Sequence, residues 1–119
     1  MSEYETKDSG RRIEFDSGMK RDIEDDKPAF HLIIPKGVPY KEQMLTRWAG
    51  LMQRGKVKYG PRNWELAKSD EELERFKASA LRHMIQWLNG EDDEDHASAV
   101  FFNVQAAEYV KWRKKSESS

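Results

Sequence analysis

A run of five adjacent acidic residues, 91–95, lies between Gly90 and His96. Adjacent carboxylates repel one another in water at neutral pH, so the run needs a physical reason. One reason is a solvated turn that caps a helix, a role for which Asp92 and Asp93 are well placed. The other is a cation site, because five acids exceed what a cap needs.

Two histidines add imidazole nitrogens to the cation hypothesis. If the helices before and after the acidic run are antiparallel neighbours, His83 lies about two turns back from the loop and His96 lies one turn nearer to it. Carboxylates with one or two imidazoles suit Mg²⁺ or Mn²⁺ better than Zn²⁺. A packed or surface histidine is the alternative reading for both residues.

A second group of chemically useful side chains is the string KYGPRNWE at residues 58–65, in a Gly-Pro loop. Aromatic rings can stack on a nucleobase, an amide can bind its edge, and cations can hold phosphates. These candidates are Tyr59 and Trp64 for stacking, Asn63 for the base edge, and Lys58 and Arg62 for phosphates. Alternatively, Trp64 closes the end of a helical bundle and the charges are solvated.

Other chemistry receives little support. In FDSGMKRD, residues 15–22, Gly18 permits a tight turn and Lys20 and Arg21 add cations near it. The chain has no cysteine, no GxSxG string and no glycine-rich phosphate loop of the Walker or GxGxxG type. If the protein is an enzyme, metal-activated water is the chemistry that remains open.

Composition limits the class of protein. The chain has 119 residues, of which 36% are charged and 37% hydrophobic, with a net charge of -1. We therefore expect one domain at residues 13–113, with disordered tails at 1–12 and 114–119. The balanced charge disfavours a nucleic-acid polymer as partner. Neither a signal peptide nor an apolar run of about 20 residues is visible, so we expect a cytoplasmic protein without a membrane partner, in the host cytoplasm if phage-encoded.

Apolar spacing predicts three helices. The first should run from Tyr40 to Val57, with Pro39 in its first turn. Its apolar stripe consists of Met44, Leu45, Trp48, Leu51 and Met52. The second should begin at a capping box, Ser69 with Glu72, and end at Asn89-Gly90. Its predicted inward face consists of Leu73, Phe76, Ala80, Met84, Trp87 and Leu88.

The third helix should begin near Asp93 or Glu94 and run to about Trp112, with acids in its first turn and bases in its last. Its predicted inward residues are Ala97, Val100, Phe101, Val104 and Ala107. The run FHLII, 30–34, lies between prolines and predicts a short strand or extended arm that lies on the helices. We therefore predict an all-α fold of three main helices with an extended N-terminal arm, completed by homo-oligomerisation as a homodimer or homotetramer.

The order SGMKRD, KPAFHLI, KYGPRNWE, ALRHMIQWLNGEDDEDH and then Asn103 resembles the small phage-type dATP/dGTP diphosphohydrolases. These are the MazZ-like branch of the all-α MazG and HisE nucleotide pyrophosphohydrolases. The resemblance covers about residues 15–108. It implies a metal-dependent hydrolase that splits a purine deoxynucleoside triphosphate, dGTP or dATP, into the monophosphate and pyrophosphate, with Mg²⁺ or Mn²⁺ as cofactor.

The sequence departs from the wider group, which holds magnesium with ExxE followed by ExxD. Here the pairs are Glu71 with Glu74 and Glu91 with Glu94, and the second ends in Glu and straddles the predicted turn. We take the matching positions to be metal ligands His83, Glu91, Asp95 and His96, with Glu94 in reserve, and Glu91 or Asp95 as general base. Substrate-binding candidates are Arg21, Lys58, Tyr59, Arg62, Asn63, Trp64, Arg82 and Asn103.

The alternative hypothesis is a non-enzymatic helical adaptor. Its interaction surfaces would be the acidic turn and the basic C-terminal tail, because charge is segregated between them. The two hypotheses differ in whether a metal ion with a nucleotide raises the melting temperature.

Overall fold

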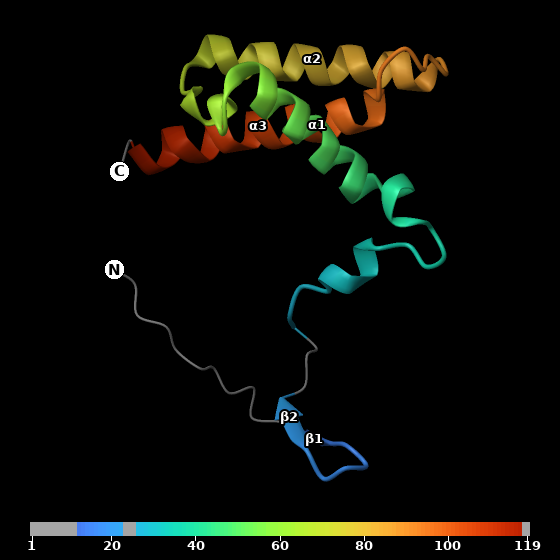
Figure 1. The fold of residues 1–119 in the computed structure, drawn as a ribbon. Coiled ribbons are helices and arrows are strands. Elements are labelled where there is room, and N and C mark those ends of the chain that lie inside the picture. The colour runs from blue at the N-terminus through green and yellow to red at the C-terminus, as the bar shows by residue number, and fades with distance from the viewer. Residues whose placement is uncertain (1–11, 23–25, 118–119) are drawn as a thin grey trace. The chain divides into compact units, whose positions relative to one another are not determined.

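The structure is a computed structural model that describes residues 12–22 and 26–117. Contacts divide the chain into two units, residues 1–33 and 34–119, and the second contains the three α-helices (Figure 1). The predicted N-terminal tail lies outside the described residues, apart from its last residue. The predicted boundaries of a single domain at 13–113 stay a prediction.

The first unit contains a small antiparallel hairpin, which corrects the purely all-α prediction to a mostly helical fold. Strands β1 (Arg12–Glu14) and β2 (Lys20–Asp22) pair with Ile13 opposite Arg21. Gly18 has φ 89° in the connecting turn, a conformation that glycine adopts without a steric penalty. The tight turn predicted at this glycine is therefore present.

The apolar run of the arm forms a short 3-10 helix, η1 (Phe30–Ile33), and the predicted strand or extended segment is wrong. The backbone N–H of Leu32 donates to the carbonyl of Ala29 at 3.0 Å, which closes a single turn. Flanking prolines limit the run to about one turn but do not require it to be extended. The side chains of Phe30 and Leu32 are 73% and 74% exposed.

The first predicted helix is split into two pieces. A 3-10 turn, η2 (Tyr40–Glu42), begins directly after Pro39, and α1 (Met44–Tyr59) follows. Between them Gln43 has extended backbone angles, so the α-helix begins later than predicted. Gly60 ends α1 with φ 90°. A second 3-10 turn, η3 (Asn63–Leu66), then leads to the next helix.

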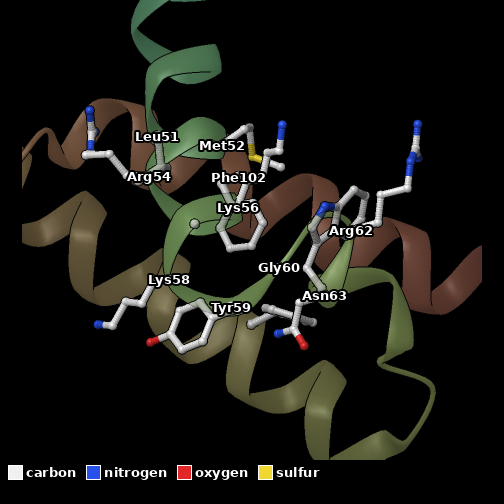
Figure 2. Close-up of a pocket in the computed structure, with 13 residues that line it drawn as sticks. Leu51, Met52, Arg54, Lys56, Lys58, Tyr59, Gly60, Arg62, Asn63 and Phe102 are labelled. Atoms are coloured by element: carbon white, nitrogen blue, oxygen red, sulfur yellow. The ribbon is translucent and has the colours of Figure 1, made fainter.

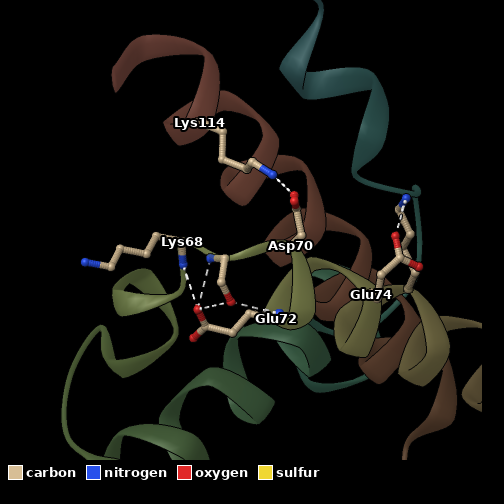
Figure 3. A network of polar contacts seen from close by, with 7 residues as sticks. Lys68, Asp70, Glu72, Glu74 and Lys114 are labelled. Atoms are coloured by element: carbon tan, nitrogen blue, oxygen red, sulfur yellow. Dashed lines mark hydrogen bonds and ion pairs between the residues drawn. The ribbon is translucent and has the colours of Figure 1, made fainter. Parts of the chain in front are cut away.

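The second helix begins as predicted. Helix α2 (Asp70–Leu88) starts after Ser69, whose hydroxyl accepts from the backbone N–H of Glu72 at 3.1 Å. The Glu72 carboxylate accepts in return from the backbone N–H of Ser69 at 3.0 Å (Figure 3). A further bond from the Lys68 backbone, the largest cause, lowers the pKa of Glu72. This capping box satisfies donors that the helix itself leaves unpaired.

Helix α3 (His96–Glu117) begins two or three residues later and ends five residues later than predicted. Residues 114–117, predicted as part of a tail, are therefore helical. Lys114 forms an ion pair with Asp70, which joins the end of α3 to the start of α2 (Figure 3).

The buried faces of α2 and α3 differ from the predicted ones. On α3, Phe101 and Val104 are exposed, and the buried residues are mostly small or polar: His96, Ser98, Ala99, Asn103, Ala106, Ala107 and Val110. On α2, Leu73, Phe76 and Ala80 are partly buried as predicted, whereas Met84, Trp87 and Leu88 are exposed. Small side chains allow two helices to approach closely, and the largest apolar groups then lie outside the contact.

The helical unit has few large buried side chains. Helix α2 lies along α3, and α1 crosses α3, where the ring of Trp48 meets that of Phe101 edge to face at 5.6 Å (Figure 1). Among the described residues, the buried hydrophobic ones are Ala67, Ala99, Ala106, Ala107 and Val110. None of the described helices is long and apolar enough to cross a membrane.

Candidate metal and nucleotide site

Three side chains around the α2–α3 turn form a candidate metal cluster: Glu91, Asp93 and His96. One ligand atom from each lies within 4.8 Å of the others. Gly90, with φ 76°, turns the chain after α2, and His96 is the first residue of α3. The two carboxylates are exposed, while the imidazole is 2% exposed.

The imidazole of His96 is held from both sides. Its Nε2 lies 2.7 Å from the Asp93 carboxylate, and its Nδ1 lies 2.9 Å from Nδ1 of His83. An ionised carboxylate only accepts, so Nε2–H of His96 donates to Asp93 and, in the neutral pair, Nδ1–H of His83 donates to His96. The bond to His96 lowers the pKa of Asp93. Burial, followed by the charge of Arg82, lowers the pKa of His83.

The donor set fits a hard divalent cation. Two carboxylates and one imidazole are ligands that Mg²⁺ and Mn²⁺ accept, and both ions commonly keep water or phosphate oxygens in their remaining positions. A metal at Nε2 of His96 would take the place of the proton on that nitrogen. His96 would then carry its proton on Nδ1 and donate it to Nδ1 of His83, as metal-bound histidines commonly donate their other ring N–H to a neighbouring group.

Asp95, predicted as a ligand and as a possible general base, has other partners. Its two oxygens accept from Nε and Nη2 of Arg47 at 2.9 and 2.7 Å. They also accept from the backbone N–H and the hydroxyl of Ser98 at 3.1 and 2.8 Å. The Arg47 guanidinium, the largest cause, holds the pKa of Asp95 well below its usual range. Asp95 therefore caps α3, the role that the sequence had suggested for Asp92 or Asp93.

A cavity of about 410 Å³ lies where the end of α1 and η3 approach α2 and α3 (Figure 2). Aromatic and aliphatic side chains form much of its wall, and cationic side chains surround Phe102 in the view of Figure 2. The lining residues are Leu51, Met52, Arg54, Gly55, Lys56, Lys58, Tyr59, Gly60, Arg62, Asn63, Trp64, Phe76 and Phe102. Pockets of this size, mainly apolar with a few polar groups, commonly bind small ligands.

All five substrate-binding candidates from the KYGPRNWE string line this cavity: Lys58, Tyr59, Arg62, Asn63 and Trp64. The Trp64 ring also meets Phe102 at 6.1 Å and Tyr109 at 5.2 Å. Trp64 therefore packs against other aromatic rings and also lines the pocket, so the two roles considered for it do not exclude each other. Arg62 has φ 60°, unusual for a residue with a side chain, and pairs with Glu65.

The other predicted substrate residues are placed elsewhere. Arg82 Nη2 lies 3.5 Å from Nε2 of His83, beside the cluster. Asn103 is buried, and its amide donates to the carbonyl of Ala99 at 2.8 Å. Arg21 belongs to the hairpin of the first unit. Glu94, the reserve ligand, is not among the three residues of the cluster.

Several residues of the site were not identified from the sequence. Asp93 was considered only as a cap, although Asp-x-x-His spacing places it one turn from His96. Phe76 was assigned to the core, and Phe102, Arg54 and Lys56 received no role. The sequence has no local signal that places Phe76 and Phe102 together, because they belong to separate helices. Their ring centroids lie 6.1 Å apart in the fold.

One face of α2 contributes a residue to the cavity wall and another that contacts the cluster. Phe76 lines the cavity and His83 supports the cluster, seven residues further along α2 and on the same face. At 1.5 Å per residue, they are roughly 10 Å apart along the helix.

The fold and the site define a mostly helical domain with a candidate metal cluster at the α2–α3 turn and a pocket lined by aromatic and cationic side chains. Residues 17–119 match the family model described as dATP/dGTP diphosphohydrolase, N-terminal. The chain belongs to this family of diphosphohydrolase enzymes. Searches of curated proteins and of solved structures found no match.

Proposed function

We propose that the protein hydrolyses purine deoxynucleoside triphosphates, dGTP or dATP, to the monophosphate and pyrophosphate, with Mg²⁺ or Mn²⁺ at the acidic turn. Family membership supports the diphosphohydrolase activity and favours it over the adaptor hypothesis. The observation that supports the finer proposal is that the helical unit has both a candidate metal cluster at the α2–α3 turn and a pocket lined by aromatic and cationic side chains.

The pocket has the groups that a purine nucleotide requires. The rings of Phe76, Phe102 and Trp64 offer apolar surface to a base, and the Asn63 amide can both donate to and accept from its edge. Cationic side chains on the rim balance the charge of the phosphates. These cations are Arg54, Lys56, Lys58 and Arg62.

Glu91, Asp93 and His96 are the proposed ligands. A bound divalent ion supplies charge neutralisation on the triphosphate and lowers the pKa of a coordinated water. His83 orients the His96 ring through the bond between their Nδ1 atoms. The exposed Glu91 carboxylate, 3.4 Å from the Gln86 amide, is the candidate base that accepts the proton of the attacking water. The water oxygen forms the new bond to the α-phosphorus, the bond from that phosphorus to the oxygen bridging to the β-phosphate breaks, and pyrophosphate leaves.

The proposal includes a homodimer or homotetramer. Among the described residues, the buried hydrophobic ones are four alanines and one valine, a small core for a domain of this length. Contact with another copy would bury further apolar side chains. Light scattering tests this part, and a monomeric mass would contradict it.

The activity is tested by incubating purified protein with each of the four deoxynucleoside triphosphates and Mg²⁺ or Mn²⁺. The expected products are dGMP or dAMP with pyrophosphate, and EDTA should abolish their formation. The variant Glu91→Gln should lose at least 100-fold in turnover, whereas Glu108→Gln, an exposed acid of α3, should not. Formation of the diphosphate and inorganic phosphate, or metal-independent turnover, would exclude this function.

A further inference from the structure

Helix α2 has a second apolar stripe, which faces away from α3. Leu81, Met84, Ile85 and Leu88 follow the spacing of three, four and seven residues that places side chains on one helix face. Their exposed fractions are 63%, 36%, 49% and 69%. At 100° per residue, this stripe lies roughly 150° around the helix from the Phe76 and His83 face. Of the described helices in this unit, α3 is the one with extensive contact to α2 (Figure 1).

The ends of the stripe carry opposite charges. Lys77 lies one turn before Leu81 on the same face, and the acidic turn, 91–95, follows Leu88. Lys77 pairs with Glu74 at 3.2 Å, but both are exposed, and such pairs contribute little. The stripe is therefore apolar in its middle, with a lysine at one end and five acids at the other.

We propose that α2 pairs antiparallel with α2 of a second copy, about a two-fold axis between Met84 and Ile85. Leu81 then packs against the partner's Leu88, and Lys77 reaches the partner's Asp92 in the acidic turn. Each acidic turn thus receives a lysine from the other copy at Asp92, which lies outside the cluster of Glu91, Asp93 and His96.

Charge selects this orientation. A parallel pair would bring two acidic turns of five carboxylates each side by side, and like charges at short range repel. The antiparallel pair separates the two turns and gives each a cation. Self-complementary contact about a two-fold axis is also the commonest arrangement in homo-oligomers.

The proposed α2 interface assumes the homo-oligomer of the proposed function, but it does not depend on nucleotide hydrolysis. The chain contains no cysteine, so introduced cysteines report the pairing without background. Met84→Cys, close to the axis, should form disulfide-linked dimers under mild oxidation. Leu81→Cys and Leu88→Cys should not do so singly. In the antiparallel pair, residue 81 of one copy and residue 81 of the other lie roughly 10 Å apart along the helix direction, and the same holds for residue 88. The double variant L81C/L88C should cross-link, because position 81 lies opposite the partner's Leu88.

Two further variants, one with a control and one with a charge-swap rescue, separate packing from charge. Ile85→Lys should raise the dimer dissociation constant at least 10-fold, whereas Val57→Lys, at a 79% exposed position of α1, should leave it unchanged. Lys77→Glu should weaken the dimer about threefold, and K77E/D92K should restore it. Circular dichroism checks that each variant is folded.

Each outcome decides the proposal. Cross-linking of Met84→Cys and the double variant, with rescue by the charge swap, supports the antiparallel pair. Efficient cross-linking of Leu81→Cys and Leu88→Cys singly shows a parallel pair and overturns it. An oligomer without any of these cross-links leaves the proposed homo-oligomer intact but overturns this surface. A monomeric protein, in which the chain's own N-terminal segment covers the stripe, overturns both.

Discussion

Nδ1 of His83 lies 2.9 Å from Nδ1 of His96, and this bond joins the middle of α2 to the first residue of α3. Both imidazoles are buried, with exposed fractions of 8% and 2%. Since Asp93 binds the other nitrogen of His96, the pair has one consistent assignment of protons when both rings are neutral. A packing contact between the helices thereby fixes the orientation of a candidate metal ligand.

Removing this bond should destabilise the protein. His83→Leu leaves Nδ1 of His96 buried without a partner, which should lower the free energy of unfolding by about 1–3 kcal/mol. His83→Asn places an amide near the position of the lost Nδ1 and should recover part of that loss. Urea unfolding at pH 8 makes the comparison. Equal stability of the two variants would show that the bond contributes nothing.

The Asp95 and Arg47 pair should stabilise the start of α3 in a pH-dependent way. Asp95→Asn weakens the charged bonds to Arg47 and should cost roughly 1–3 kcal/mol in the free energy of unfolding. Because the pKa of Asp95 is lowered in the folded state, its contribution is present above the unfolded value, about pH 4. The contribution is lost as the pH falls further.

Unfolding of wild type and Asp95→Asn from pH 7 down to pH 2 tests the sign. The stability difference should be largest near neutral pH and shrink below about pH 4. Arg47→Met, combined with Asp95→Asn in a double-mutant cycle, isolates the pair. A difference that grows in acid would contradict this account of the carboxylate.

The pocket residues should affect nucleotide binding rather than the metal. Asn63→Ala removes an amide from the cavity wall and should raise the KM for the purine substrate about 10-fold, the equivalent of one good hydrogen bond. Manganese affinity, measured by calorimetry without nucleotide, should not change. An unchanged KM for both purine nucleotides would remove Asn63 from the proposed base contacts.

Features fixed by residues close together in the sequence could be predicted from it. Features that depend on contacts between residues far apart in the sequence could not. Ser69 and Glu72 predicted the start of α2 because a capping box lies within one turn. The approach of His83 to His96 followed from the short turn between two helices. The choice of capping acid did not follow, because Arg47, 48 residues before Asp95, binds that carboxylate.

The buried face of α3 shows the same limit. Apolar periodicity alone assigned Phe101 and Val104 to the interior, yet they are 45% and 49% exposed. Periodicity identifies an apolar face but not the element that covers it. Of the pocket, the sequence predicted the loop residues 58–65 but not the phenylalanines contributed by the two other helices.

Asp93→Asn is the most direct test of the account, because it changes one proposed ligand and leaves the Asp95 cap intact. Pyrophosphate release from dGTP and dATP with Mn²⁺ should fall at least 100-fold in this variant and stay at the wild-type level in Glu108→Gln. Calorimetry should show weaker manganese binding by Asp93→Asn alone. Wild-type turnover and wild-type manganese affinity in Asp93→Asn would contradict the assignment of the metal site to Glu91, Asp93 and His96.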